Sequence, residues 1–139
     1  MPLASWIVTC HHRPELLAAT LPVLHLAAWP PGWEYEIIAA CADMPSAGIA
    51  SAHRAHVVMT AAPHPSGKRN AALAACRGEL VMTTDDDDFQ SPLRPSMAVQ
   101  AYERGHKLSG IREFRRLHLA TGMVVRCCGR GTQVDLPPV

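Results

Sequence analysis

The chain has 139 residues, of which 48% are hydrophobic and 18% charged, and its formal net charge at neutral pH is +1. This composition predicts one globular domain over residues 1–139 and argues against disorder, and the small net charge gives no reason to expect nucleic acid or a membrane surface as a partner. The five cysteines have no C-x-x-C spacing, which argues against a disulfide framework and a structural zinc site. No apolar run resembles a signal peptide or is long enough to span a bilayer, so we expect a cytoplasmic protein.

Strand and helix patterns alternate in the first half of the chain. In chain order we expect a buried strand over residues 5–10, a helix beginning at Pro14, a second strand over 35–41, a loop over 42–52 that is rich in Ala, Ser and Gly, and a shorter strand over 56–60. Leu17, Leu21 and Leu24 share one face of the first helix, and Pro14 suits its first position. Pro22 is expected to kink or end that helix.

The second half continues the alternation. We expect a helix over residues 68–77, a strand over 79–84, a helix over 95–104, strands within 107–128 with Thr121-Gly122 as a hairpin tip, and a loose, turn-rich tail from Gly129. Gly78 stands where the glycine that ends a helix is usually found. Strands that alternate with helices predict an α/β fold with a mainly parallel sheet and flanking helices.

Four consecutive aspartates, Asp85 to Asp88, follow the fourth predicted strand. Ligands of open α/β sheets bind outside the carboxyl ends of the strands, which is where these side chains would lie. If the strand continued, Asp85 and Asp87 would share one side and Asp86 and Asp88 the other. Carboxylate oxygens suit Mg²⁺ or Mn²⁺, which proteins hold through one or two carboxylates together with substrate phosphates. The alternative is a solvated acidic turn.

Three segments together resemble the N-terminal, nucleotide-sugar-binding half of family 2 glycosyltransferases, which have the Rossmann-like GT-A fold. They are I-V-T-C-H-H-R-P-E-L-L from Ile7, G-K-R-N-A-A-L-A-A-C-R-G-E-L from Gly67, and T-D-D-D-D-F-Q-S-P from Thr84. The last of these resembles the family's D-x-D-D motif. The resemblance implies a nucleotide-sugar-binding core over residues 5–92, followed by a short C-terminal helix and strands over 93–139 and a truncated acceptor half.

The same resemblance implies a site for a nucleotide-sugar donor, most simply a UDP-sugar, with an unknown acceptor. Asp85 and Asp87 would hold Mn²⁺ or Mg²⁺ against the diphosphate, with Asp88 as a further metal ligand. The residues implied at the nucleotide are Thr9, Cys10, His11, Arg13, Cys41, Lys68, Arg69, Asn70, Asp85 and Asp86. The implied activity is a metal-dependent transfer of a hexose.

The sequence departs from the family at several points. Cys41 and Ala42 stand where members often have an acidic pair, with Asp43 one residue later, and His11 replaces the usual tyrosine. After Glu113 only the isolated Asp135 resembles the family's catalytic acid, and no catalytic residue is assigned from the sequence.

Other interpretations of the sequence remain open. The chain could be a truncated module that binds a nucleotide without transferring a sugar, with self-association through residues 107–128. It could be a nucleotidyltransferase, although residues 10–14 lack the glycines of a phosphate loop. Zinc could also bind the pair His53 and His56 or the pair His11-His12.

Overall fold

The computed structural model describes residues 1–110, 113–118, 120–121 and 123–128. Its contacts divide the chain into two compact units, residues 1–100 and residues 101–139. The division falls eight residues after the boundary of the core expected from the sequence, within the last helix.

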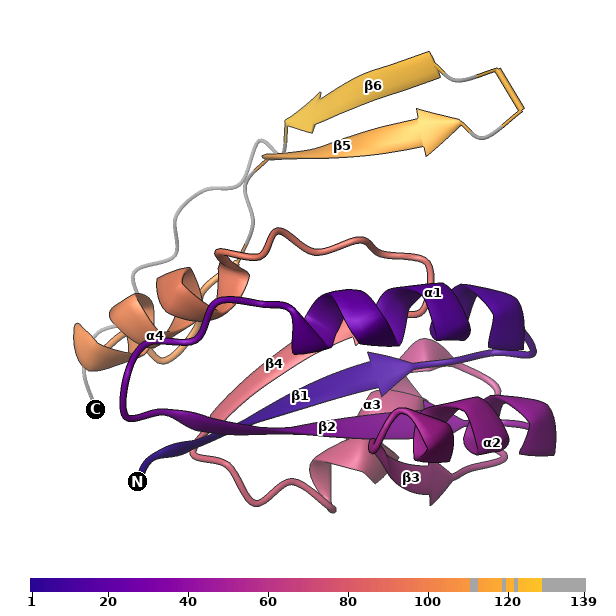
Figure 1. Cartoon of the computed structure of the whole chain (residues 1–139), viewed down its shortest axis with the longest axis horizontal. Helices are drawn as coiled ribbons and strands as arrows, with labels where there is room; N and C mark the ends of the chain where they lie inside the picture. Colours follow the sequence, from indigo (N-terminus) through magenta and orange to yellow (C-terminus); the bar gives the residue numbers. More distant parts are fainter. Residues whose placement is uncertain (111–112, 119, 122, 129–139) are drawn as a thin grey trace. The chain divides into compact units, whose positions relative to one another are not determined.

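The first unit is a parallel sheet with helices on both faces (Figure 1). Its elements are β1 (Leu3–Thr9), α1 (Pro14–His25), β2 (Glu34–Cys41), α2 (Met44–Ala52), β3 (His56–Met59), α3 (Pro65–Leu73), β4 (Leu80–Asp85) and the greater part of α4 (Arg94–Glu103). The four strands are all parallel and lie in the order β3-β2-β1-β4. The prediction of an α/β fold with a parallel sheet is confirmed.

The order in which strands are added to the sheet reverses between β1 and β4, although the two strands are parallel. The chain first moves outward from β1 to β2 and β3, and it then returns through α3 to add β4 on the other side of β1. The last residues of the two central strands, Thr9 and Asp85, are direct neighbours in the register. In open α/β sheets such a switch point is where a crevice for ligands forms, outside the carboxyl ends of the strands.

Apolar side chains of β1 and β2 alternate between the two faces of the sheet. Trp6 and Val8 pack on the face that α1 and α2 cover, whereas Ile7 and Ile38 pack against Ala72 of α3. Strands covered on both faces have few polar positions, which explains the continuous apolar runs in the sequence. This buried frame fixes the carboxyl ends of β1 and β4.

The expected loop over residues 42–52 is wrong, because most of it forms α2. Asp43 caps this helix: its side chain accepts a hydrogen bond of 2.8 Å from the Ser46 N–H and one of 2.9 Å from the Ser46 hydroxyl. The small residues Ser46, Ala47 and Ala50 let the helix lie close to the sheet. The composition that suggested a loop is therefore the composition of a tightly packed helix.

Gly78 does not end a helix, since α3 runs from Pro65 to Leu73 and its C-cap is Ala74. Instead, Gly78 lies against the backbone of β1, where a Cβ would be 2.6 Å from Ser5 N and 2.7 Å from Leu3 O. Its N–H donates to the Ser5 hydroxyl at 2.8 Å. The glycine is needed for the close approach of two chain segments at the start of β4.

Pro22 neither ends α1 nor stops its leucines from packing. The helix continues to His25, and Leu17, Leu21 and Leu24 are all buried. Proline 22 removes one backbone hydrogen bond near the end of the helix, and the burial of three leucines on one side offsets that loss.

The second unit holds the end of α4 and a two-stranded antiparallel sheet, β5 (Glu113–His118) and β6 (Met123–Cys128). The helix is followed by Gly105, whose φ of +81° favours glycine. Thr121 lies in the turn between the strands, as expected, while Gly122 and the tail from Gly129 lie outside the described residues. None of the described helices is long and apolar enough to cross a membrane.

Replacement of Gly78 by alanine is expected to lower the free energy of unfolding by about 1–3 kcal/mol, because its Cβ would overlap backbone atoms that cannot move aside. The matched control is Gly48→Ala in α2, where a Cβ meets nothing within 4 Å. That change should raise the free energy of unfolding by about 0.5–1 kcal/mol. Urea titrations followed by tryptophan fluorescence measure both, and an unchanged midpoint for Gly78→Ala would contradict the close approach.

Loss of the α2 cap in Asp43→Ala is expected to cost about 0.5–2 kcal/mol at neutral pH. Partial burial by itself raises the pKa of Asp43, but hydrogen bonds from Ser46 and His12 outweigh it and lower the pKa below its usual value. A carboxyl with a lowered pKa stabilises the fold above its unfolded pKa, and this contribution disappears as the pH falls through the folded pKa.

The difference between wild type and Asp43→Ala should therefore shrink on acidification. Asp43→Asn keeps an acceptor for the Ser46 N–H but carries no charge, so its smaller cost should depend little on pH. Urea titrations at neutral and acidic pH measure these differences. A cost for Asp43→Ala that stays the same across this pH range would refute the role of the charge.

Candidate functional site

A cavity of about 400 Å³ lies at the switch point, at the carboxyl ends of β1 and β4. The wall combines the end of β1 and the loop after it, the loop before α3 with the first turns of that helix, and the end of β4 with the turn after it. Its residues are Thr9, Cys10, His11, Arg13, Pro63, Pro65, Lys68, Asp85 and Asp87. Polar side chains from three separate segments thus converge on one space, as in a binding site for a small molecule.

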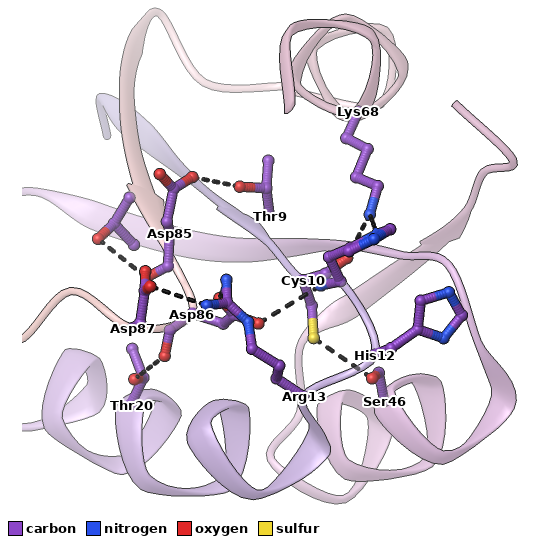
Figure 2. Close-up of polar contacts among 12 residues, drawn as sticks. Thr9, Cys10, His12, Arg13, Thr20, Ser46, Lys68, Asp85, Asp86 and Asp87 are labelled. Atoms are coloured by element: carbon purple, nitrogen blue, oxygen red, sulfur yellow. Dashed lines mark hydrogen bonds and ion pairs between the residues drawn. The ribbon is translucent and has the colours of Figure 1, made fainter. Parts of the chain in front are cut away.

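Asp85, the last residue of β4, is held from two sides. The Thr9 hydroxyl of the neighbouring strand donates to its Oδ1 (Figure 2). From α3, Arg69 donates through Nη2 to the same oxygen at 2.8 Å and to Oδ2 at 3.1 Å. The Arg69 Nε is buried and has no hydrogen-bond partner among the described residues. The carboxylate of Asp85 is therefore fixed in direction and neutralised by one guanidinium.

Asp86 is fully buried and points away from the cavity, into the loop after β1. Its carboxylate accepts hydrogen bonds from the Arg13 guanidinium and from the His11 N–H, the latter at 3.4 Å. Its backbone carbonyl accepts a hydrogen bond of 2.6 Å from the Thr20 hydroxyl of α1. The side chain thus acts as an internal support for the loop that forms one wall.

Arg13 joins this buried aspartate to the exposed one beside it. Its Nη2 contacts Asp86, and its Nη1 donates to Asp87 Oδ2 at 2.8 Å (Figure 2). Partial burial by itself lowers the pKa of Arg13, but the charges and hydrogen bonds of the two aspartates outweigh it and raise the pKa. The guanidinium therefore stays charged and holds the Asp87 carboxylate at the cavity.

The ammonium group of Lys68 is a buried cation in the cavity wall, with the residue only 2% exposed. Its Nζ donates to the Cys10 carbonyl at 2.8 Å and lies 2.8 Å from His11 Nδ1. The ion pairs within 4.0 Å in the described part of the chain do not include Lys68. Both of its protein partners are uncharged acceptors, because an ammonium can only donate and Nδ1 must therefore accept.

The two cysteines near the site are unsuited to nucleophilic chemistry. Burial raises the pKa of the Cys10 thiol, which lies 3.3 Å from the Ser46 hydroxyl, and raises that of Cys41 to about 12. A thiol with a raised pKa is protonated at neutral pH and is a weak nucleophile. The structure therefore gives these thiols a packing role.

The structure brings together seven of the residues expected at the site. Those on the cavity wall are Thr9, Cys10, His11, Arg13, Lys68, Asp85 and Asp87. Of the others, Cys41 is buried in the core, Asn70 and Asp88 are exposed away from the wall, and Arg69 and Asp86 act through neighbouring side chains. The roles expected for them at the nucleotide or the metal stay predictions.

Pro63 and Pro65 also line the cavity, and neither residue was expected at the site from the sequence. Both lie in the segment P-H-P-S-G, between the expected strand over residues 56–60 and the expected helix over 68–77. Its place directly before the G-K-R-N segment was the available signal, because a rigid turn next to a binding helix must border the same space.

The alternation expected along the four aspartates fails after the first, because β4 ends at Asp85 and a turn follows. Asp85 and Asp87 still border the same cavity, although Asp87 lies in the turn after the strand. Although Asp88 is exposed, partial loss of hydration raises the pKa of its carboxyl, and the charges of Asp85 and Asp87 add to this. No group of three or more His, Cys, Asp or Glu side chains is arranged to hold a metal ion in the described part of the chain, which gives no support to the zinc alternative.

The two carboxylates of the cavity wall fit a magnesium or manganese ion, because these ions need few ligands from the protein. Such ions bind through one or two carboxylates and complete their coordination with substrate phosphates and water. Asp85 and Asp87 supply two carboxylates at one wall. The metal itself stays a prediction.

Comparisons with known proteins bear on the fold and the family. The crystal structure of S. aureus TarS is similar with a TM-score of 0.64 and 23% identity, over 76% of this chain and 20% of TarS. Structures of S. aureus TarS 1–349, alone and in complex with UDP, have the same TM-score at 22% identity and are covered to 33%. The chain thus spans a third or less of these proteins. No curated protein matches the chain in sequence.

This likeness confirms the predicted GT-A type of nucleotide-binding fold. In addition, the profile of the family described as glycosyl transferase family 2 matches residues 5–119, which is most of the sequence. The chain therefore belongs to glycosyl transferase family 2.

Proposed function

We propose that the chain binds a nucleoside-diphosphate sugar, in particular a UDP-sugar, in the cavity at the switch point, and that it transfers the sugar to an acceptor hydroxyl. The observation that carries the proposal is the composition of the cavity wall, which includes Asp85 and Asp87 together with the buried cation of Lys68. The carboxylates suit a metal bound to a diphosphate, and the cation suits the diphosphate itself.

The choice of uridine is supported by the similar structure of TarS, which was determined in complex with UDP. A cavity of about 400 Å³ is within the range that small-molecule sites occupy. The donor sugar and the acceptor are not specified by any residue of the wall.

In this proposal Asp85 and Asp87, the two carboxylates on the cavity wall, hold Mg²⁺ or Mn²⁺. The metal, when bound, would neutralise the negative charge that develops on the departing diphosphate. Arg69 and Arg13 orient the two carboxylates through the ion pairs at 2.8 Å described above. Thr9 fixes Asp85 from the other side and limits its rotation.

The transfer is a displacement at the anomeric carbon of the sugar. The acceptor oxygen forms a bond to that carbon, the bond to the diphosphate oxygen breaks, and UDP leaves with the electron pair. The proton of the acceptor hydroxyl passes to a general base. We assign no residue to this last role, since both carboxylates of the wall are engaged by arginines.

A second candidate function is a nucleotide-binding module that does not transfer a sugar by itself. The site favours it, because both carboxylates of the cavity wall are engaged by arginines and no general base is assigned among the described residues. Binding of UDP without hydrolysis or transfer of a UDP-sugar would favour the module. Self-association through residues 107–128 stays a prediction, which light scattering at high concentration tests.

The proposed site is tested by calorimetric titration of the wild-type chain with UDP, in Mn²⁺ and in chelator. Wild type should bind UDP more tightly with the metal. Asp87→Asn keeps an acceptor for Arg13 but removes the charge, so it should lose at least about tenfold in the affinity measured with Mn²⁺. The matched control is Glu34→Gln, which removes an exposed carboxylate at the amino end of β2.

Two results would contradict this proposal in different ways. Equal UDP affinities with Mn²⁺ and with chelator, unchanged in Asp87→Asn, would remove the metal from the site. An absence of binding for UDP, GDP and CDP alike would mean that the aspartates form a solvated acidic turn.

A further inference from the structure

We infer that Lys68 binds the diphosphate of the nucleotide directly, so that the site holds nucleoside diphosphates even without a metal ion, and a metal at the aspartates adds further affinity. This inference rests on the proposed function and names the residue that recognises the anionic part of the ligand. It separates two electrostatic contributions in one cavity, one from the aspartates through a metal and one from a fixed cation.

The first argument is the burial of a charge without a counter-charge. Lys68 is 2% exposed, and a buried ammonium loses its hydration, which is costly unless an anion or several strong acceptors replace the water. Its partners are the Cys10 carbonyl and His11 Nδ1, both uncharged. An anion in the cavity would supply the missing charge.

The second argument is that the neighbouring carboxylates are already paired with other cations. Arg69 forms an ion pair with Asp85, and Arg13 forms ion pairs with both Asp86 and Asp87. No carboxylate of the described residues lies within 4.0 Å of Lys68. All the ion pairs of the three site carboxylates are therefore made with the two arginines. Lys68 forms no ion pair with them and is left to bind a ligand.

The third argument concerns hydrogen bonds and position. An ammonium has three N–H donors, and Lys68 uses two of them on the protein, which leaves one for a phosphate oxygen. The first turns of α3 contribute Pro65 and Lys68 to the wall, and the amino end of a helix favours negative charge. Figure 2 shows Lys68 extending from its helix toward the loop that begins at Cys10.

A different role would be that of a tether, in which Lys68 only holds the loop after β1. A tether would affect every part of the nucleotide, because His11 and Cys10 belong to the wall. A phosphate contact would affect UDP and spare uridine. Comparison of these two ligands in chelator therefore distinguishes the roles.

The experiment measures binding of UDP, uridine and pyrophosphate by calorimetry in chelator, to wild type, Lys68→Met and Lys68→Arg. Wild type should bind UDP and pyrophosphate in chelator, and Lys68→Met should lose about tenfold or more for both, as expected for a charge-assisted hydrogen bond. Its affinity for uridine should stay unchanged. Lys68→Arg keeps the charge and should retain most of the affinity for UDP.

Several results would overturn the inference. If Lys68→Met lost UDP and uridine equally, with a lower unfolding temperature, Lys68 would be a tether. If wild type bound UDP with Mn²⁺ but not in chelator, the inference would fail while the metal site at Asp87 stood. If wild type bound no nucleotide under either condition, the proposed function would fail as well.

Discussion

The site depends on the ion pair between the buried carboxylate of Asp86 and the guanidinium of Arg13. A charge with no exposure to water needs strong partners, and Asp86 obtains them from Arg13 and the His11 N–H. These contacts join the turn after β4 to the loop after β1, and the bond from Thr20 adds α1. Because the loop is fixed in this way, the Cys10 carbonyl is available to Lys68, and Arg13 reaches Asp87.

The electrostatic balance of the site follows from the same arrangement. Four adjacent aspartates would repel one another strongly if all of them faced one space. The fold avoids this by burying Asp86 beside Arg13 and by pairing Asp85 with Arg69. The cavity wall therefore carries two carboxylates that arginines orient, together with the buried cation of Lys68. Such an arrangement is preorganised for a ligand that carries negative charge and a metal.

The fold explains the position of the site, while the chemistry comes from the residues placed there. A parallel sheet with a switch point presents a crevice to many different ligands, so membership of a family does not by itself define the donor or acceptor. The chain matches a fifth to a third of the TarS structures, and the acceptor side of any reaction depends on more than this cavity.

The sequence by itself determined the strands that carry the site, because the apolar residues within 5–10 and 79–84 predicted two strands that end within one residue of Thr9 and Asp85. It also determined Pro14 as a helix start and the aspartates as a carboxyl-end feature. Only the tertiary structure decided that Asp86 turns inward, because β4 ends at Asp85 and the period of two no longer applies.

Contacts between segments distant in sequence decided the remaining features. Gly78 was expected to end a helix. A glycine is needed there because a Cβ would overlap the backbone of β1 at Ser5, which is 73 residues away in the sequence. In the same way, the sequence suggested that Lys68 lies near the nucleotide, but its burial and its lack of a carboxylate partner follow from where α3 packs. Local patterns determine which elements form, whereas the partner of a charge depends on which elements become neighbours.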